Sequence, residues 1–376
     1  MALQNLRVVE MGQAFAGPWC AEILATLGAD VIKVERPEIG DETRRWGPPF
    51  WGDTAAVFHT VNGNKKSVAL DLKNLQDLDD FLSLLGETDI FLHNMRPGVL
   101  EKMGLGPEEM LARFPRLIYG EISAFGHKGP MKMMPGYEIL SQAFGGVISI
   151  TGEADRNPVR CGPSVCDFGS GMCLVIGILA AVNERHRTGK GGLVQTSLFE
   201  TALSWTSVSA TSYLATGETP GRMGANHHLI APYGYFETET QPIMVACASD
   251  VLFRKLADAF GHPEWKTDPR FSSNPARVLN KSEIEPLVAD ILKGASQDHW
   301  LELLTTSGVP CSPVHTVPEA LTHPQAEALG MIQTDPDRPE VRSVSLPINL
   351  NGERPGLRFG APELGSSTVS DWDGKE

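Results

Sequence analysis

The chain has 376 residues, of which 41% are hydrophobic, and its formal net charge is −14. This length supports a large core and more than one domain, and the excess of acidic residues argues against a broad nucleic-acid-binding surface. An anionic ligand must therefore be bound by a local cluster of basic residues. No run approaches the roughly 20 continuous apolar residues of a membrane span, and the first residues lack the pattern of a secretion signal.

The cysteines are scattered along the chain, without a CxxC pair or a neighbouring cluster of histidines. This pattern is typical of reduced thiols in a cytoplasmic protein, and we expect neither a metal site nor a redox cofactor. The six positions are Cys20, Cys161, Cys166, Cys173, Cys247 and Cys311.

The first third of the chain alternates strand and helix patterns. Residues 6–11 form a short β-rich run, and a glycine-containing turn separates them from apolar residues at helical spacing over 20–30. Residues 31–35 form a second strand, which completes a βαβ unit with parallel strands. Further strands are expected at 66–72, 89–94 and 116–123, with helices at 75–87 and 107–114. The sequence therefore predicts an α/β fold whose large domain is Rossmann-like, with a mostly parallel sheet.

A strand, a glycine turn and a second strand that ends in Glu35 are also typical of dinucleotide-binding domains. That fingerprint requires G-x-G-x-x-G, whereas this turn has only Gly12 and Gly17, with four residues between them. The residue after Glu35 is moreover Arg36. A nicotinamide-dependent enzyme is therefore disfavoured.

Asp167 is isolated in the stretch PSVCDFGSG, and an apolar helix with a basic last turn is expected at 171–187. This places Asp167 just before a helix N-terminus. The local pattern leaves three roles open for Asp167: a helix cap, a solvated turn residue or a reactive carboxylate.

The second half of the chain has a different pattern. Residues 231–249 contain two short strands joined by a polar turn. Amphipathic helices are expected at 251–261, 282–294 and 299–308. These elements predict a smaller α+β domain.

Several long blocks resemble family III CoA-transferases, which include formyl-CoA and carnitine CoA-transferases and are related to α-methylacyl-CoA racemases. The resemblance covers nearly the whole chain and fades after about residue 350. It implies a large CoA-binding domain from residues 1–205 and about 330–376, a small domain at about 225–325, and a homodimer of interlocked chains. The matching blocks are residues 16–44, 93–106, 123–138, 166–192 and 231–238.

By this resemblance, Asp167 corresponds to the nucleophilic aspartate of the transferases. Such an enzyme moves CoA from an acyl-CoA to a free carboxylic acid through an aspartyl mixed anhydride and an aspartyl-CoA thioester. An aspartate with its ordinary pKa of about 3.9 is ionised at neutral pH, and backbone N–H groups close to it could stabilise the oxyanions.

The resemblance also implies a channel for CoA, in which Arg36 is the contact that we favour most. Pro135 replaces a lysine of formyl-CoA transferase, and Lys102 stands where an arginine is usual, so a charged contact is lost only at Pro135. The implied contacts are Phe15, Ala16, Arg36, Leu70, Asp71, Leu72, Lys73, Asn94, Met95, Arg96, Lys102, Pro135, Gly136, Tyr137 and Glu138.

Two other functions remain open. A racemase needs a second base, but Tyr137 stands where racemases have a histidine, and a phenol of pKa near 10 is a poor base at neutral pH. His127 is close in sequence, and we expect it to be a loop residue. The other alternative is a non-catalytic CoA-binding protein. We therefore expect acyl-CoA and a small carboxylic acid as substrates, with no nucleic acid or membrane partner; the sequence does not identify either compound.

Overall fold

The computed structural model describes residues 1–372 and divides the chain into two compact units. The large unit combines residues 1–147, 160–208 and the chain from 321 onward, and the small unit combines 148–159 with 209–320. The sequence analysis had assigned residues 148–159 to the large domain. They join the small unit because Gly224 N–H donates to the Gly152 carbonyl at 2.9 Å and Arg222 Nε donates to the Glu153 carbonyl at 3.2 Å.

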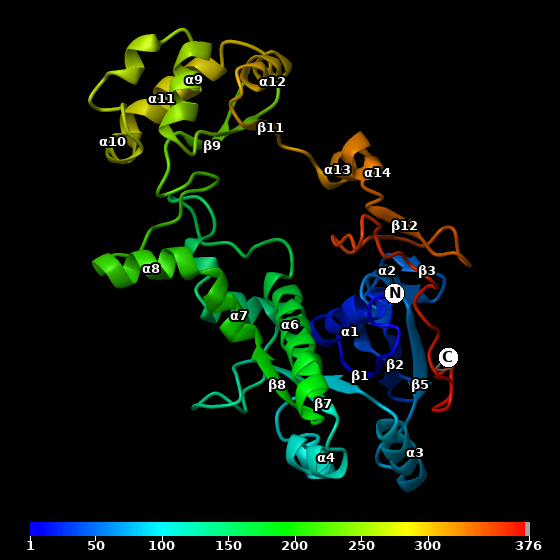
Figure 1. Ribbon diagram of the computed structural model, residues 1–376. Coiled ribbons are helices and arrows are strands. Elements are labelled where there is room, and N and C mark those ends of the chain that lie inside the picture. The colour runs from blue at the N-terminus through cyan, green and yellow to red at the C-terminus, as the bar shows by residue number, and fades with distance from the viewer. Residues whose placement is uncertain (373–376) are drawn as a thin grey trace. The chain divides into compact units, whose positions relative to one another are not determined.

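The large unit is built on a six-stranded sheet in which every neighbouring pair is parallel (Figure 1). This confirms the predicted α/β fold with a parallel sheet. In spatial order the strands are β5 (Lys65–Ala69), β2 (Asp30–Glu35), β1 (Arg7–Met11), β6 (Ile90–His93), β7 (Ile118–Ser123) and β8 (Gly192–Ser197). The chain builds the sheet outward in one direction from β1 and in the other direction from β6, so the strand order reverses between these two neighbours. A crevice at such a switch point is the usual ligand site of the fold.

Helices cover both faces of this sheet, and apolar residues of its strands pack on both sides. On one face Val8 packs into a core cluster that includes residues of α1 and α6, and on the other face Val9 packs with residues of α3 and α4. The helices of the large unit are α1 (Ala16–Thr26), α2 (Ala56–His59), α3 (Leu75–Gly86), α4 (Pro107–Arg113), α5 (Glu138–Phe144), α6 (Val165–Thr188), α7 (Leu198–Trp205), α13 (Val317–Thr322, at the boundary) and α14 (Pro324–Ala328).

Helix α6 begins six residues earlier than the sequence predicts, which makes Asp167 its third residue. The expected start was wrong because the residues before Gly171 were left outside the helix, although Gly169 and Gly171 both belong to it. Both are helical glycines at close contacts: a Cβ on Gly169 would lie 2.7 Å from Thr201, and one on Gly171 would lie 2.8 Å from the Ala16 carbonyl. The glycines therefore let α6 pack tightly on α7 and α1.

Within the described residues, α6 alone is long and apolar enough to cross a membrane by length and composition. The sequence analysis had found no such run. The helix contacts α1, α7, β7 and β8, and fewer than half of the residues in its most apolar window are buried. Its exposed apolar side chains include Met172 and Ile176.

The C-terminal part of the chain covers the edge strand β5. Arg358 N–H donates to Asn64 Oδ1 at 2.6 Å, and Ser367 N–H donates to the Ser67 carbonyl at 2.9 Å. The large unit is thus completed by both ends of the chain. Two small antiparallel pairs also belong to it: β3 (Phe50–Trp51) with β4 (Thr54–Ala55), and β12 (Ile332–Thr334) with β13 (Arg342–Val344).

The small unit contains a three-stranded antiparallel sheet and four helices around a separate apolar core. Arg277 is fully buried there and donates to the carbonyls of Ala231 and Phe271 and to Asp250. The elements are β9 (Tyr233–Phe236), β10 (Ile243–Ala246), β11 (Cys311–Pro313), α9 (Asp250–Ala259), α10 (Asn274–Leu279), α11 (Lys281–Leu292) and α12 (Gln297–Thr306), and α8 (Ser207–Thr216) leads into the unit.

Candidate active site

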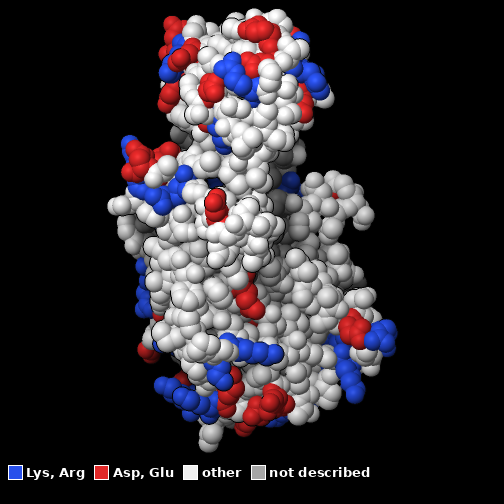
Figure 2. All heavy atoms as spheres, turned by 90° about the vertical axis from the view of Figure 1, so that its left-hand side faces the viewer, with Lys and Arg blue, Asp and Glu red and all other residues white. Residues whose placement is uncertain are grey.

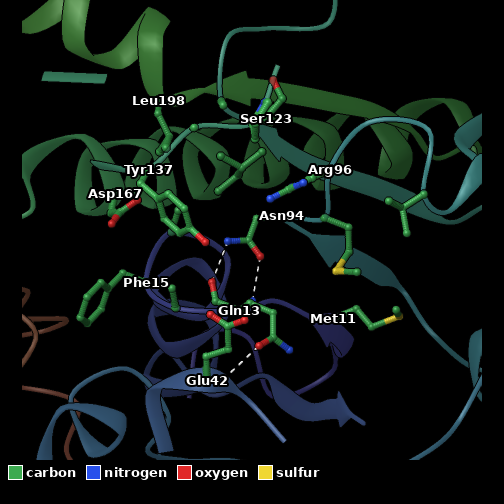
Figure 3. A pocket seen from close by; sticks show the side chains of 18 of the residues that line it. Met11, Gln13, Phe15, Glu42, Asn94, Arg96, Ser123, Tyr137, Asp167 and Leu198 are labelled. Carbon is green, nitrogen blue, oxygen red and sulfur yellow. Dashed lines mark hydrogen bonds between the residues drawn. The ribbon is translucent and has the colours of Figure 1, made fainter. Parts of the chain in front are cut away.

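A cavity of about 760 Å³ lies at the carboxyl ends of the large sheet (Figure 3). The residues that follow each strand contribute to its wall: Gln13 after β1, Arg36 after β2, Lys73 after β5, Asn94 after β6 and Leu198 after β8. Residues at the end of β7 complete it. This is the position at which doubly wound parallel sheets bind their ligands.

The structure brings nearly all of the predicted site residues to this cavity. Asp167 and every predicted CoA contact except Lys102 line it. Lys102 lies in the short 3₁₀ helix η2 (Glu101–Met103), whose last residue, Met103, lines the cavity instead. Whether these residues contact CoA stays a prediction.

Several lining residues were missed by the sequence analysis. Ser123 and Leu198 end or follow predicted strands of a parallel sheet, which was a usable signal for both. Trp46 and Arg160 lie in irregular segments, and no sequence pattern marked them. Strand β5 also ends earlier than predicted, at Ala69, so the next four residues form a loop that lines the cavity.

Asp167 points its side chain into the cavity beside Tyr137 and Leu198 (Figure 3). Among the described residues its carboxylate has no hydrogen bond or ion pair. Its backbone is held by Glu138: Asp167 N–H donates to Oε2 at 2.8 Å, and Cys166 N–H donates to Oε1 at 3.2 Å. The sequence analysis had suggested that backbone N–H groups close to Asp167 could stabilise an oxyanion. These two N–H groups are not free to do so, because both donate to Glu138.

Glu138 is itself fixed by the next turn of α5. Gln142 Nε2 donates to Glu138 Oε1 at 2.7 Å, and Gln142 Oε1 accepts from Cys161 N–H at 2.8 Å. The start of α5 and the segment before α6 are thus joined through side chains. This arrangement holds the carboxylate of Glu138 against the backbone of Asp167, so two carboxylates lie close together.

The environment changes the ionisation of Asp167. Burial, followed by the negative charge of Glu138, raises the pKa of Asp167 to about 7. The expectation of an ordinary pKa is therefore wrong, because the pKa of the Asp167 carboxyl lies close to neutral pH. Burial and the same glutamate raise the pKa of the Cys166 thiol to about 12, so this neighbour remains a neutral thiol.

Aromatic rings lie next to Asp167. The Phe168 ring packs on the edge of Trp19, with centroids 5.1 Å apart, and lies 5.8 Å from the ring of Phe15. Phe15 in turn contacts Trp46 at 5.9 Å, and both of these residues line the cavity. The wall next to Asp167 is therefore mostly apolar, which accounts for the burial contribution to its pKa.

No histidine is among the described residues that line the cavity. His127 lies outside the cavity lining, and its Nδ1 is 2.8 Å from Glu121 Oε1. Tyr137 precedes α5 and has an exposed side chain. Over residues 1–372, no group of three or more His, Cys, Asp or Glu is arranged to hold a metal ion.

Four basic side chains line the cavity. Arg36, Lys73 and Arg96 follow β2, β5 and β6, whereas Arg160 lies seven residues before Asp167 in the chain. Arg160 Nη2 donates to the Gly162 carbonyl at 2.8 Å, and no carboxylate of the described chain lies within ion-pair distance of it. Positive charge is thus present on both sides of the strand-order reversal.

Comparisons with known proteins identify the family of this chain. The family model "CoA-transferase family III" matches residues 3–368. An acetyl-CoA:oxalate CoA-transferase of Acetobacter aceti is 36% identical, over 96% of this chain and 92% of the relative, and the human succinyl-CoA:glutarate CoA-transferase is 32% identical, over 92% and 78%.

Solved structures extend the match to three dimensions. A CaiB/BaiF family protein from Brucella suis superposes with a TM-score of 0.84 at 38% identity, covering 96% of both chains. A Mycobacterium tuberculosis protein, Rv3272, gives a TM-score of 0.87 at 26% identity over 96% of this chain and 97% of that one. The protein is therefore a CoA-transferase and belongs to CoA-transferase family III.

Proposed function

We propose that this enzyme transfers CoA from an acyl-CoA donor to a free carboxylic acid, with Asp167 as the covalent nucleophile. The observation that carries the proposal is the Asp167 carboxylate, which faces the cavity without a hydrogen-bonding or ion-pair partner in the described chain. A carboxylate used only for structure would be paired, because burial of an unpaired charge is costly. An unpaired one is free to react.

The proposed reaction has four balanced steps. An Asp167 oxygen attacks the thioester carbonyl of the donor, the C–S bond breaks, and CoA thiolate leaves a mixed anhydride. The thiolate then attacks the Asp167 carbonyl and releases the product acid, which carries one oxygen from Asp167. The acceptor carboxylate attacks this aspartyl-CoA thioester to form a second anhydride and thiolate. Attack of the thiolate on the acceptor carbonyl yields the new acyl-CoA and restores Asp167.

Only the ionised form of Asp167 can perform the first attack, since a protonated carboxyl is a weak nucleophile. Because the pKa of Asp167 is raised to about 7, its carboxylate is also more basic, and therefore more nucleophilic, than that of an ordinary aspartate. The aromatic wall formed by Phe15 and Phe168 helps to keep water away from the anhydride. Hydrolysis of that intermediate would waste the thioester.

The cavity suits a long polyanionic ligand such as CoA. Arg36, Lys73 and Arg96 follow β2, β5 and β6 and line the cavity, where they can neutralise phosphates. The pantetheine arm would then run past Asn94 toward Asp167. Arg36, as the first residue after β2, remains the favoured contact for the 3′-phosphate.

We further propose a small dicarboxylic acid as the acid substrate. The curated relatives are named for oxalate, glutarate, succinate, citramalate and mesaconate. Arg160, which lines the cavity close in sequence to Asp167 and has no carboxylate partner, is a suitable ligand for the second carboxylate of such an acid. Arg160→Gln should lower kcat/KM for a dicarboxylic acid much more than for the monocarboxylic acid of the same length.

Racemisation is the rival reaction on this fold. It needs a second base near the α-carbon, and no histidine of the described chain lines the cavity, while Tyr137 occupies the place of the racemase histidine. Incubation of a 2-methylacyl-CoA in D₂O should therefore give no α-deuteration above background. Rapid α-exchange without CoA transfer to any acid would assign the protein to the racemases.

We propose a homodimer of interlocked chains. Its support is a group of exposed large apolar side chains on three helices that contact one another, and Figure 2 shows a wide area with few charged side chains on the side where α7 lies in Figure 1. A mass photometry series at nanomolar concentration should show dimers only; folded monomers would contradict interlocking. The exposed residues are Ile139, Leu140, Phe144, Met172, Ile176, Leu203 and Trp205.

The transfer itself is tested with a matrix of acyl-CoA donors and free acids, with products followed by mass spectrometry. The donors should include acetyl-CoA and succinyl-CoA, and the acids should be pairs of dicarboxylic and monocarboxylic acids of equal length. Transfer of CoA to at least one acid is the expected result. CoA binding without any transfer or covalent adduct would favour the non-catalytic alternative.

A further inference from the structure

The loop between β1 and α1 has a strained backbone in the wall of the cavity. Ala14 has φ of +61°, a left-handed conformation that disfavours any residue with a Cβ. Its neighbours Gln13 and Phe15 line the cavity together with it. A loop of this kind keeps such a conformation only if its surroundings hold it there.

Side chains bind each backbone N–H group of residues 12–14. Gly12 N–H donates to Glu10 Oε1 at 3.1 Å, Gln13 N–H to Asn94 Oδ1 at 2.8 Å, and Ala14 N–H to Asp41 Oδ1 at 3.2 Å.

Two carbonyl groups of the same loop accept hydrogen bonds from side chains. Lys33 Nζ donates to the Gly12 carbonyl at 3.0 Å, and Asn94 Nδ2 donates to the Gln13 carbonyl at 2.8 Å (Figure 3). Asn94 thus binds both the N–H and the C=O of Gln13.

Most of these groups belong to a buried ionic cluster, formed by Glu10, Lys33, Asp41 and Lys65. Lys33 Nζ lies 2.8 Å from Glu10 Oε1 and 2.9 Å from Asp41 Oδ2, and Lys65 Nζ lies 2.9 Å from Glu10 Oε2. The side chains of all four have no solvent exposure or almost none. Burying four charges adds little net stability compared with an apolar core, so the cluster needs another reason to be there.

The neighbours of the cluster show what it does. The Asp41 side chain also accepts from Thr43 N–H and its hydroxyl, at 2.9 and 2.7 Å, and Lys65 Nζ also donates to the Pro18 carbonyl in α1 at 2.8 Å. The cluster therefore ties the loop, the start of α1 and the segment after β2 into one unit. Dinucleotide-binding domains use glycines for the corresponding turn, whereas this turn uses charges.

We propose that Lys33 and Asp41 are positioning residues, which hold the β1–α1 loop in its acyl-CoA-binding conformation before the ligand arrives. Neither residue lines the cavity, so both act through the loop. The proposal rests on the proposed function in naming acyl-CoA as the ligand, but the rigidity of the loop can be measured without turnover. Pre-organisation of this kind improves ligand affinity by removing an ordering cost.

The first test is amide hydrogen exchange on the unliganded wild-type protein. The amides of residues 12–14 should exchange as slowly as those of the neighbouring strand β1, because all three donate to side chains of the protein. Fast exchange of this segment in the free protein, followed by protection only when CoA is added, would overturn the proposal. This test does not depend on the folding of any variant.

The second test is a pair of substitutions at Asp41. Asp41→Ala should raise the KM for acyl-CoA by about tenfold or more, with a much smaller change in kcat, because it removes a charged partner of the loop. Asp41→Asn, which keeps an acceptor for the Ala14 N–H, should have a smaller effect. Exchange at residues 12–14 should accelerate in the same order.

The third test is rescue by glycine. Ala14→Gly should recover part of the KM loss in the Asp41→Ala background, since glycine adopts the left-handed conformation without steric cost. The single variant Ala14→Gly supplies the reference KM against which the rescue is measured. A merely structural role for Asp41 would give no rescue, and absence of rescue would contradict the proposal.

Asp335 provides the matched control. It is as buried as Asp41, accepts from the N–H groups of Asp337 and Arg338, and pairs with the Arg338 guanidinium, but it does not touch the loop. Asp335→Ala should lower the unfolding temperature without raising the KM for acyl-CoA. An equal rise in KM in this control would show that general destabilisation, and not the loop, causes the effect.

Discussion

Two aspartates near the cavity have very different surroundings: Asp167 lines the cavity, and Asp41 lies behind the loop between β1 and α1. On the side of β2, Asp41 is fully buried, pairs with Lys33 and accepts from Thr43. Although burial alone would raise the pKa of Asp41, Lys33 and Thr43 hold it below its ordinary value. On the side of β8, Asp167 has no partner for its carboxylate, and burial and Glu138 raise its pKa to about 7.

This difference shows that burial does not assign a role to a carboxylate; its partners do. A carboxylate with donors on both oxygens is stabilised as an anion and holds structure. A partly buried carboxylate that has no donor and lies close to a second carboxylate is destabilised as an anion, and this destabilisation is relieved when it reacts. Asp41 therefore holds structure, whereas the unpaired carboxylate of Asp167 is the group that we propose as the nucleophile.

The largest expected effect separates these two roles directly. Asp167→Ala should lower kcat for CoA transfer by about 10³-fold or more, because it removes the nucleophile, while CoA still binds. Asp41→Ala should instead act mainly on KM. Steady-state kinetics with isothermal titration of CoA checks both, and substantial turnover by the Asp167 variant would contradict its assignment.

The second prediction concerns the cations of the β2 side. If Arg36 binds the 3′-phosphate, wild type should prefer CoA over dephospho-CoA by roughly 10–100-fold, the range expected for a charge-assisted hydrogen bond. Arg36→Ala should lose most of this preference. Arg160→Ala, on the other side of the cavity, is the control and should keep it. Equal preferences in wild type and the Arg36 variant would remove Arg36 from the site.

The third prediction uses stability. Because the folded pKa of Asp167 is raised to about 7, the folded protein binds more protons than the unfolded chain, and wild type loses stability as the pH rises from about 4 to 7. Asp167→Asn should therefore be more stable than wild type at pH 8, by about 1–3 kcal/mol, and the gain should vanish near pH 4.

Asp41 should behave in the opposite way. Its folded pKa is lowered, so its contribution is present above the unfolded pKa and is lost as the pH falls through the folded value. Asp41→Asn should be less stable than wild type at pH 7, with the deficit shrinking in acid. Denaturant unfolding across the pH range measures the stability of both variants. If both substitutions changed the free energy of unfolding in the same direction near neutral pH, the comparison would be contradicted.

The smallest expected effect concerns Glu138. In wild type, kcat/KM for the acyl-CoA donor should rise with pH through about 7, as Asp167 ionises. Glu138→Gln removes one of the two causes of the raised pKa and should move this midpoint to lower pH by about one unit. The control is Glu42→Gln, which alters a cavity carboxylate that does not contact α6. If the midpoint did not move in the Glu138 variant, burial would be the sole cause of the raised pKa of Asp167.

The sequence predicted the part of this site that depends on regular structure. The family resemblance selected residues such as Arg36 and Asn94, and the structure brings them to one cavity because the loops after parallel strands meet at one edge of the sheet. Asp167 was selected by the family resemblance, and its place inside α6 was missed because the apolar pattern that predicted the helix begins only at Gly171.

The electrostatics of the site could not be predicted from local pattern. Glu138 precedes Asp167 by 29 residues, and only the packing of α5 against α6 brings its carboxylate to the Asp167 backbone. Lys33 belongs to a strand whose pattern gave no sign that a lysine is fully buried there. Both facts depend on tertiary contacts with partners distant in sequence.

The central claim, that Asp167 carries the transferred group, is tested most directly by trapping. Wild type is mixed with an active acyl-CoA donor, treated with hydroxylamine, digested with trypsin and analysed by mass spectrometry. The peptide of residues 161–185 contains Asp167 and a single other acidic residue, Glu184, so fragmentation can locate the hydroxamate. We predict modification at Asp167 that requires the donor and is absent from Asp167→Asn. Turnover without any adduct at Asp167, or with an adduct at another residue, would contradict the mechanism.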